Sequence, residues 1–330
     1  MQLIGNNQVI QKDNNVYNYE YKNFTITGEK IVEMIEHHQK TFLKSFGDTD
    51  SISYIDINTI YLQNNKTCIN GSFITQYLLN TFNLKFNNLY AIDNAAVILG
   101  DWGTNYYHIL TEEIPNFIKI NTYNKNLHVI MNYNETYIKD ILSVFKFENP
   151  IIKLEKSNLY NIRKCYTTNI SLSGKPSKYE LELVRNYLIN KNILKMEKQE
   201  LGVIIYRIED ERRILNHSEM LNYLNNKYSN IKWIVFHKMS FLDTINLFSK
   251  AKIIIAPHGA GLTNMMFSST GCNIIELMPY SDPNECYYHL SSMLDHNYYC
   301  IVCEDTGRDN KKNMNIKFEY LDKVMKIIKL

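Results

Sequence analysis

The sequence contains no long apolar run. No window approaches the roughly 18 to 20 consecutive apolar residues that a membrane-spanning helix needs. Residues Met1 to Asn7 also lack the basic segment and apolar run of a secretory signal. We therefore expect a soluble, cytoplasmic protein without a transmembrane segment.

The sequence also lacks an excess of either charge. Its 36 Lys and Arg residues nearly balance 34 Asp and Glu residues, for a net charge of +2. Acidic and basic residues are interspersed, so no basic stripe of the kind that binds nucleic acid is present. We expect no nucleic-acid partner, and any anionic ligand must be held by a local group of residues.

Cysteine is sparse, with six residues scattered along the chain. Cys300 and Cys303 form one closely spaced pair, but no second Cys or His pair completes a zinc site. We expect reduced thiols. Asp48 and Asp50 match an Asp-x-Asp pattern associated with metal and nucleotide-sugar binding, but they lie in a polar turn and we interpret them as a solvated loop. The sequence predicts no metal site and no cofactor.

The 330 residues, 45% of them hydrophobic, are enough for two domains. Ser171 to Ser177 is rich in Gly, Pro and Ser and is the best candidate for a linker. We predict an acceptor-side α/β domain over residues 1–172 and a nucleotide-sugar-binding domain over 173–312. A final helical segment, 313–330, is expected to pack back on the first domain.

The first domain is predicted to begin with an irregular β-rich lead-in. Residues 1–95 contain short alternating or aromatic runs and one amphipathic stretch near 31–42. An apolar strand then ends at Gly100. Later strands are predicted at 127–131, 151–154 and 163–167, with a helix at 138–147, which together indicate an α/β layer.

The second domain shows a regular alternation of strands and helices after a helix at 179–194. This alternation predicts a parallel sheet with right-handed crossovers. The strands are predicted at 202–206, 233–236, 253–256, 274–277 and 298–302, and the helices at 218–228, 241–248, 262–267 and 285–294.

A glycine-bracketed turn follows the buried strand 253–256 and leads into a short helix. Helix N-termini present free N–H groups and a partial positive charge, and glycines allow close approach to the backbone. This pattern predicts a diphosphate site. The alternative is that the glycines only form a tight turn. The predicted site residues are His258, Gly259, Ala260, Gly261, Leu262, Thr263 and Asn264.

Glu276 ends the next strand, at the same carboxyl edge of the sheet as His258. Ligands of open parallel sheets bind outside this edge. We expect Glu276 to accept hydrogen bonds from ribose hydroxyls. The alternative is a carboxylate that pairs with a local arginine or caps the following turn.

Arginines follow the first strand of the second domain. Arg207, Arg212 and Arg213 leave the same edge, and the planar guanidinium group pairs bidentately with phosphate oxygens. We predict that Arg207 and Arg212 bind phosphate. Pairing with acidic residues 209–211 in a solvated loop is the alternative, and it applies least to Arg207, because the strand fixes its position.

His108 and Glu112 are four residues apart on a predicted helix, so they share one face. Thr104 or Asn105 is a plausible N-cap, and Pro115 is expected to kink the helix just beyond the pair. A histidine oriented by a carboxylate suits general-base catalysis. The alternative is a core histidine satisfied by its neighbour, with Glu112 and Glu113 as ordinary first-turn acids.

Three stretches of the sequence resemble one family, the family 61 glycosyltransferases and their DUF563 relatives. They are Asn105 to Pro115, Arg207 with Arg212 to Asn216, and Pro257 to Asn264 with Glu276. This family includes plant xylosyl- and arabinosyltransferases and animal protein O-linked GlcNAc transferases. The resemblance covers roughly residues 96 to 305, and 258–264 is its most specific element.

The resemblance implies a GT-B architecture of two facing Rossmann-like domains. It also implies inverting transfer of a GlcNAc- or pentose-class sugar from a nucleotide sugar, usually UDP-linked, without an obligatory metal. Three features depart from the family: Ile109 stands in place of a usual Trp, His217 in place of a Glu, and no membrane anchor is found. The acceptor is expected to be a glycan or a lipid- or protein-linked glycoconjugate.

The residues and the resemblance together predict that the cleft between the domains is the active site. His108 or Glu112 is the base, with the other as its orienting partner, and Asn105 and Tyr107 lie beside them on the acceptor side. Two other classes stay open. One is a non-catalytic nucleotide- or glycan-binding protein; the other is a dinucleotide-dependent oxidoreductase, which the charged turn after residue 206 does not favour.

Overall fold

The structure is a computed structural model. It describes residues 24–26, 52–63, 66–71, 88–98, 105–133, 135–154, 158–168, 174–196, 199–207, 211–307 and 311–329. The predictions for 16–21, 31–42 and Asp48 to Asp50 lie outside these residues. Two compact units are present: an N-terminal unit, Ser45–Leu188, and a C-terminal unit, Ile189–Leu330, which also includes Phe24–Ile26.

The C-terminal unit is built on a parallel sheet. Its strands are β8 (Leu201–Ile205), β9 (Lys232–Phe236), β10 (Ala251–Pro257), β11 (Asn273–Pro279) and β12 (Asn297–Cys303), with β1 (Phe24–Ile26) beside β12. The order is β1-β12-β11-β10-β8-β9, and every neighbouring pair is parallel. The five strands and the parallel arrangement predicted from the sequence are confirmed. β1 is an addition, because a three-residue strand gives no periodic signal.

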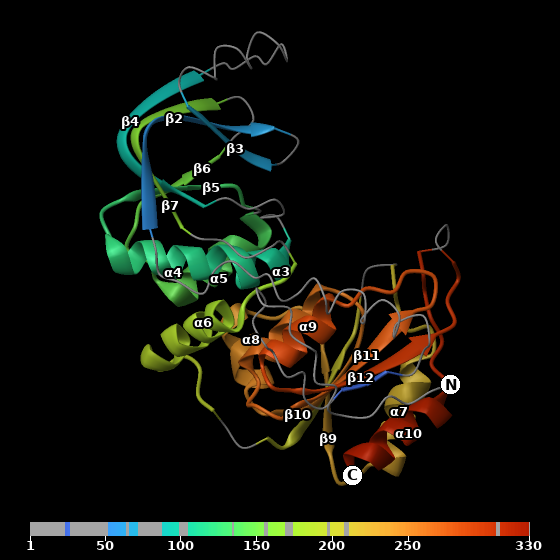
Figure 1. The fold of residues 1–330 in the computed structure, drawn as a ribbon. Helices are drawn as coiled ribbons and strands as arrows, with labels where there is room; N and C mark the ends of the chain where they lie inside the picture. Colours follow the sequence, from blue (N-terminus) through green and yellow to red (C-terminus); the bar gives the residue numbers. More distant parts are fainter. Residues whose placement is uncertain are drawn as a thin grey trace, which may run out of the picture. The chain divides into compact units, whose positions relative to one another are not determined.

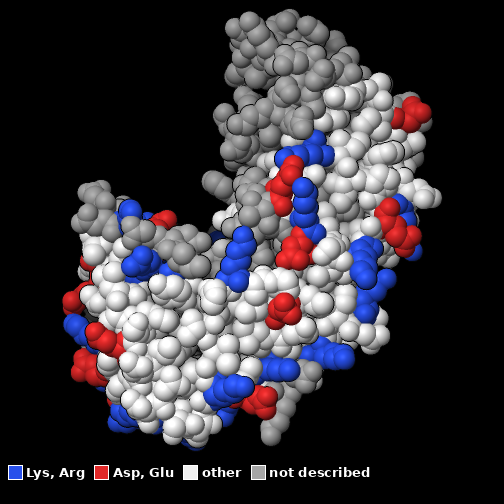
Figure 2. Space-filling model, turned by 180° about the vertical axis from the view of Figure 1, so that it is seen from behind, with Lys and Arg blue, Asp and Glu red and all other residues white. Residues whose placement is uncertain are grey.

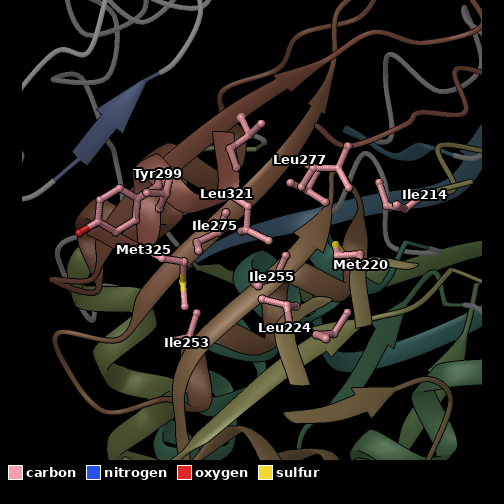
Figure 3. Close-up of a cluster of buried hydrophobic side chains, with 14 of the residues drawn as sticks. Ile214, Met220, Leu224, Ile253, Ile255, Ile275, Leu277, Tyr299, Leu321 and Met325 are labelled. Carbon is pink, nitrogen blue, oxygen red and sulfur yellow. The ribbon is translucent and has the colours of Figure 1, made fainter. Parts of the chain in front are cut away.

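Two helices cover one face of this sheet. They are α7 (His217–Lys227) and α10 (Phe318–Ile328), and they pack on aliphatic side chains of β10 and β11 (Figure 3). Leu321, Val324 and Met325 of α10 are fully buried here. The expectation that the last helix packs on the first domain is therefore wrong, because its apolar stripe completes the core of the C-terminal unit.

Polar contacts also hold α10 against α7. The carboxylate of Asp322 accepts hydrogen bonds from the hydroxyl groups of Tyr223 and Tyr228 at 2.7 and 2.9 Å, and from Lys227 Nζ at 2.5 Å. The remaining helices of the unit are α8 (Phe241–Phe248), α9 (Cys286–Met293) and the 3₁₀-helix η2 (Ala260–Phe267).

The N-terminal unit contains a mixed sheet. Its strands are β2 (Ile52–Gln63), β3 (Lys66–Gly71), β4 (Asn88–Val97), β5 (His128–Met131), β6 (Ile151–Lys153) and β7 (Asn158–Thr168), in the order β3-β2-β7-β4-β5-β6. The part from β7 to β6 is parallel, and β2 and β3 extend it in antiparallel fashion. The predicted α/β layer is confirmed, whereas β3 was not predicted. Its helices are α5 (Glu135–Phe145), α6 (Lys178–Asn190) and the run described next.

One helical run connects β4 to β5. It consists of α3 (Tyr106–His108), a π-helical turn η1 (Ile109–Glu113) and α4 (Ile114–Tyr123) (Figure 1). Pro115 does not end this run. Proline cannot donate the hydrogen bond that a regular α-helix would direct to Thr111, and the turn just before it is π-helical, with the N–H of Ile114 donating to the carbonyl of Ile109. Such turns often mark functional positions.

The predicted linker is part of the N-terminal unit, which extends through most of α6 to Leu188. The physical reason is packing of α6 on the helices before it. Tyr187 Oη donates to the carbonyl oxygen of Phe145 at 2.9 Å, and Lys119 and Glu180 form a buried ion pair at 3.7 Å. The boundary between the units thus lies at residue 188 rather than 172.

Each sheet has a topological switch point. From β8 the chain moves to β9 on one side and then returns to β10 on the other. From β4 it moves to β5 and β6 on one side and returns to β7 on the other. In open α/β sheets ligands bind outside the carboxyl ends of the strands at such points. The segments after β8 and β10, and those after β4 and β7, are therefore the places to look for a site.

Charged side chains are interspersed on the face of the molecule shown in Figure 2, where Lys and Arg lie next to Asp and Glu. No helix among the described residues is both long and apolar enough to cross a membrane.

The packing of α10 predicts a specific effect on stability. Leu321→Ala should lower the free energy of unfolding of the C-terminal unit by about 2–5 kcal/mol, because it leaves a cavity in the core. Ile327 lies on the same helix but is 40% exposed, so Ile327→Ala is a matched control with an expected loss of about 1 kcal/mol or less. Chemical denaturation measures both; equal losses would show that α10 does not complete this core.

Candidate functional site

A chain of hydrogen bonds crosses three adjacent strands of the C-terminal sheet. His258 Nδ1 lies 2.6 Å from Glu276 Oε1, and Tyr298 Oη donates to Glu276 Oε2 at 2.5 Å. The strand register explains this alignment, because Ala256 of β10, Glu276 of β11 and Cys300 of β12 lie side by side. Side chains two residues apart on a strand share a face, so His258 and Tyr298 both point toward Glu276.

This carboxylate is fully buried. Glu276 is 0% exposed, His258 6% and Tyr298 1%. Burial, and then the charge of Glu276, raise the pKa of the Tyr298 hydroxyl well above its ordinary value, so Tyr298 keeps the proton that it donates. We predicted that Glu276 binds ribose. Instead, both of its oxygens are occupied by protein groups, and it fixes the ring of His258.

Aromatic rings of α9 close over this hydrogen-bonded group. The ring of Tyr287 contacts His258 edge to face, with centroids 5.1 Å apart, and the ring of Tyr288 contacts Tyr298 in the same way at 5.5 Å. Both tyrosines are buried. The orientation of His258 is thus set by the sheet beneath it and by the helix above it.

Arg207 lies two residues after the end of β8 and reaches the turn after β10. Its Nη1 donates to the carbonyl oxygen of His258 at 3.3 Å. Gly259 permits this approach, since a Cβ atom at Gly259 would lie 2.0 Å from Arg207 Nη1, and the residue has a φ of 157°. The two segments that leave the switch point at β8 and β10 are therefore in direct contact.

Further charges gather near the same edge. Lys312 donates to Asp282 at 2.5 Å and is the main cause that lowers the pKa of Asp282, and the charges of His258 and Arg212 add to this effect. Arg212 has a left-handed backbone, with a φ of 56°, and its Nε lies 3.4 Å from Glu211 Oε1. The alternative of pairing with a neighbouring acid is thus found for this arginine, while its charge still acts on the group around His258.

The start of η2 gives the turn its backbone donors. Ala260 and Gly261 are partly exposed, whereas Leu262, Thr263 and Asn264 are buried. The first N–H groups of a helix have no partners within the helix. Of the residues predicted in this turn, Ala260 and Gly261 offer accessible backbone, and the three that follow anchor the 3₁₀-helix in the core.

The second group of predicted residues lies in the N-terminal unit, after β4 and β7. Asn105 caps the helical run, and its Oδ1 accepts from the backbone N–H of Tyr107 at 2.9 Å. His108 Nδ1 lies 2.6 Å from Glu112 Oε1, so the predicted pairing of these side chains is confirmed. The side chains are 17% and 11% exposed, which leaves the pair close to the surface.

Gly174 holds this pair in place from the other side of the switch point. Its backbone N–H donates to Glu112 Oε1 at 2.7 Å, and its carbonyl oxygen accepts from Tyr107 Oη at 3.0 Å. The ring of Tyr107 also contacts the ring of His108 edge to face, with centroids 5.1 Å apart. The segment predicted as a linker thus belongs to the site.

Glu113 differs from its neighbour. It is 1% exposed, and burial, followed by repulsion from Glu112, raises its pKa well above the ordinary value. The alternative of two ordinary first-turn acids therefore does not describe Glu113, whose carboxyl group is buried and has a raised pKa. Glu112 is the carboxylate that pairs with His108.

The two groups have complementary chemistry. The group in the C-terminal unit offers guanidinium, imidazole and backbone N–H donors, which suit a phosphorylated ligand. The group in the N-terminal unit offers an imidazole whose Nδ1 is held by a carboxylate, an arrangement that suits proton exchange with a substrate. Among the residues that the structure describes, no group of three or more His, Cys, Asp or Glu residues is placed to hold a metal ion.

Sequence reasoning missed three members of these groups: Gly174, Tyr287 and Tyr298. Tyr298 becomes visible only when the register of β12 against β11 is known. Tyr287 lies on a helix in which every residue from 287 to 293 is buried, so its burial does not single it out. Gly174 acts through its backbone, for which the sequence carries no signal beyond the glycine itself.

The contact between Gly259 and Arg207 predicts the effect of a single methyl group. Gly259→Ala should displace Arg207, lower stability by about 1–3 kcal/mol and weaken the binding of inorganic pyrophosphate. Gly271→Ala is the matched control, because Gly271 also has a positive φ, of 81°, but an added Cβ has no atom within 4 Å. Thermal unfolding and calorimetric titration test both. Equal pyrophosphate affinity in the two variants would remove this turn from the site.

Comparison with known proteins shows which protein family this sequence matches. The family described as Glycosyltransferase 61 matches residues 106–275, just over half of the chain. The chain is 33% identical over 84 residues to the EGF domain-specific O-linked N-acetylglucosamine transferase of Drosophila melanogaster. These aligned residues make up 25% of this chain and 16% of that protein.

A second relative is the protein O-linked-mannose β-1,4-N-acetylglucosaminyltransferase 2 of Canis lupus familiaris. The identity is 26% over 117 residues, which is 34% of this chain and 20% of the relative. The matched segments span a fifth or less of the length of these two relatives. The family match itself begins at the first residue of α3 and ends one residue before Glu276. It thus contains His108, Glu112 and the segments of Arg207 and His258, while Glu276, Tyr287 and Tyr298 follow it. Because this match covers more than half of the sequence, the chain belongs to glycosyltransferase family 61.

Proposed function

We propose that the protein is an inverting glycosyltransferase. It transfers a sugar of the GlcNAc or pentose class from a UDP-sugar to a hydroxyl group of a glycan or glycoconjugate. The observation that carries the proposal is that a cationic, N–H-rich group and a histidine–carboxylate pair each follow the switch point of a sheet. The printed names of the relatives, which are N-acetylglucosamine transferases, support the choice of sugar.

In this proposal the C-terminal unit binds the donor diphosphate. The guanidinium of Arg207 and the first N–H groups of η2 lie against the same turn, where phosphate oxygens can accept from both. His258 has Nδ1 engaged by Glu276, which leaves Nε2 for the ligand. Arg212 adds a further positive charge. A ribose contact for Glu276 is not part of this proposal, since its carboxylate is buried.

The N-terminal unit supplies the base. Glu112 Oε1 already faces both His108 Nδ1 and the N–H of Gly174, which suits an orienting carboxylate better than a group that must itself take up a proton. We therefore assign His108 as the base and Glu112 as its positioning partner. Nε2 of His108 takes the proton of the acceptor hydroxyl as that oxygen attacks the anomeric carbon from the face opposite the diphosphate.

Charge on the leaving diphosphate develops as the glycosidic bond breaks. Fixed donors stabilise such charge without reorganisation during the reaction. Arg207, Arg212 and the backbone of the turn are groups of this kind, so we propose that transfer needs no divalent metal.

The metal-free donor site is tested by binding UDP in the presence of EDTA. UDP should raise the unfolding temperature of the wild type, and Arg207→Ala should weaken its binding by about 1.5–3 kcal/mol through loss of a charge-assisted hydrogen bond. Lys232→Ala is the control, since Lys232 is exposed at the amino end of β9. Stabilisation that appears only with Mg²⁺ or Mn²⁺ would contradict the metal-free site.

Variants of the base test whether the N-terminal unit supplies the base while the C-terminal unit binds the donor. His108→Ala should leave UDP affinity unchanged and reduce transfer from UDP-sugars by about 100-fold or more, as expected for the loss of a general base. Glu112→Gln should reduce transfer less, because the amide still occupies the position next to Nδ1. Glu135→Gln, an exposed first-turn acid of α5 that pairs with Lys139, is the control.

These variants also distinguish the enzyme from a non-catalytic binding protein of the same fold. Release of UDP from UDP-GlcNAc and UDP-xylose, measured with a panel of hydroxyl acceptors, is the readout. Near wild-type turnover in His108→Ala would show that the pair is structural. UDP binding without turnover under any condition would favour the non-catalytic alternative.

A further inference from the structure

The N-terminal unit has a polar cavity of about 470 Å³ that the proposed reaction does not use. Its volume falls within the usual range of small-molecule sites, about 300–1,000 Å³. Its polar wall is made by Asp93 and Asn94 of β4, Asn124 and Asn126 of the turn after α4, His128 of β5 and Tyr166 of β7.

The cavity lies at the other end of the helical run from His108. That run starts after the carboxyl end of β4 and ends at Tyr123, just before the turn that leads to the amino end of β5. At about 1.5 Å per helical residue, His108 and Asn124 are roughly 24 Å apart. A ligand in the cavity is therefore distinct from a small acceptor held at His108.

The turn that forms one wall is fixed by buried contacts. Asn149 is 4% exposed, and its Nδ2 donates to the carbonyl oxygens of Asn124 and Leu127, each at 2.9 Å. Asn124 Oδ1 in turn accepts from the backbone N–H of Asn126 at 2.9 Å. Because these bonds set the turn in the absence of a ligand, binding does not pay the entropy of ordering it.

The opposite wall is the part of β4 that extends beyond β5. Pairing with β5 begins only at Ala95, opposite His128, so Asp93 and Asn94 lie before the first residue of β5. Both are exposed. Tyr166 also lines the cavity, and its ring packs beside that of Tyr123, with centroids 5.7 Å apart.

The lining chemistry selects the class of ligand. Three amides and one carboxylate offer closely spaced donors and acceptors, the phenol ring offers an apolar face with a polar tip, and only Ile92 and Leu127 are aliphatic. The described residues of the lining include no Lys or Arg, and the carboxylate of Asp93 disfavours anions. Neighbouring hydroxyl groups on a ring with apolar C–H faces match this lining, whereas phosphate and purely apolar ligands do not.

We propose that this cavity is a binding site for a neutral saccharide. It is separate from the site of sugar transfer, and it gives a glycan a second point of attachment to the N-terminal unit. The proposal concerns binding alone, so it stands or falls independently of the transfer chemistry assigned to His108.

Saturation-transfer NMR with neutral disaccharides tests the proposal. The probes are cellobiose, lactose, maltose and N,N′-diacetylchitobiose, with glucose 6-phosphate as the anionic comparison. At least one neutral disaccharide should bind the wild type. Affinity should fall about ten-fold in the double variant Asn126→Ala/His128→Ala, since each lost hydrogen bond contributes a factor of about two to ten.

Two controls locate the binding. Lys125→Ala changes an exposed residue of the same turn that pairs with Glu148 rather than lining the cavity, and it should leave binding unchanged. His108→Ala should also leave it unchanged. Amide shifts of the wild type on titration should cluster at residues 124–128, which tests the site even if the double variant does not fold.

Three results would overturn the proposal. They are the absence of binding by all four disaccharides, equal binding by the wild type and the folded double variant, and shifts that cluster around His108 instead of the turn. Preferential binding of glucose 6-phosphate would have the same effect, because it contradicts the chemistry of the lining.

Discussion

The buried contact between His258 and Glu276 is the constraint on which the candidate donor site depends. A carboxylate with no exposed surface is tolerated only when it is paired and hydrogen-bonded. His258 and Tyr298 supply those partners, and in doing so they fix the end of β10 against β11 and β12. The position of the turn after β10 follows from this contact, and so does the carbonyl group that Arg207 reaches. Contacts in the interior of the sheet therefore set the positions of the groups that would face a ligand.

His108 of the N-terminal unit is held in place by a different set of contacts. His108 and Glu112 also form a histidine–carboxylate pair, but they lie near the surface and a backbone segment fixes them from outside. A partly exposed pair of this kind can exchange protons with a substrate, whereas the buried pair mainly serves to hold position. We propose that the same two side-chain types serve different purposes here, and that the difference in burial is the reason.

Local pattern predicted much of this protein. The apolar runs Ile253 to Ala256 and Ile274 to Leu277 identified buried strands, and the helical spacing of His108 and Glu112 brought the two side chains together, as the structure confirms. The features that were not predicted depend on contacts between parts of the chain that are distant in sequence. The partner of Glu276 follows from strand register, the packing of α10 from the face that the sheet leaves open, and the role of Gly174 from a backbone contact. None of these leaves a periodic signal in the sequence.

The short strand β1 has a consequence for how the chain assembles. Phe24–Ile26 lies beside β12, near the opposite end of the sequence, although the whole N-terminal sheet lies between them along the chain. During synthesis this segment leaves the ribosome long before its partner exists, and pairing must wait until β12 has been made. Contacts between residues so distant in sequence form slowly. Between the synthesis of β12 and its pairing with β1, the outer edge of β12 has unpaired backbone groups, and strands of other chains can pair with it there.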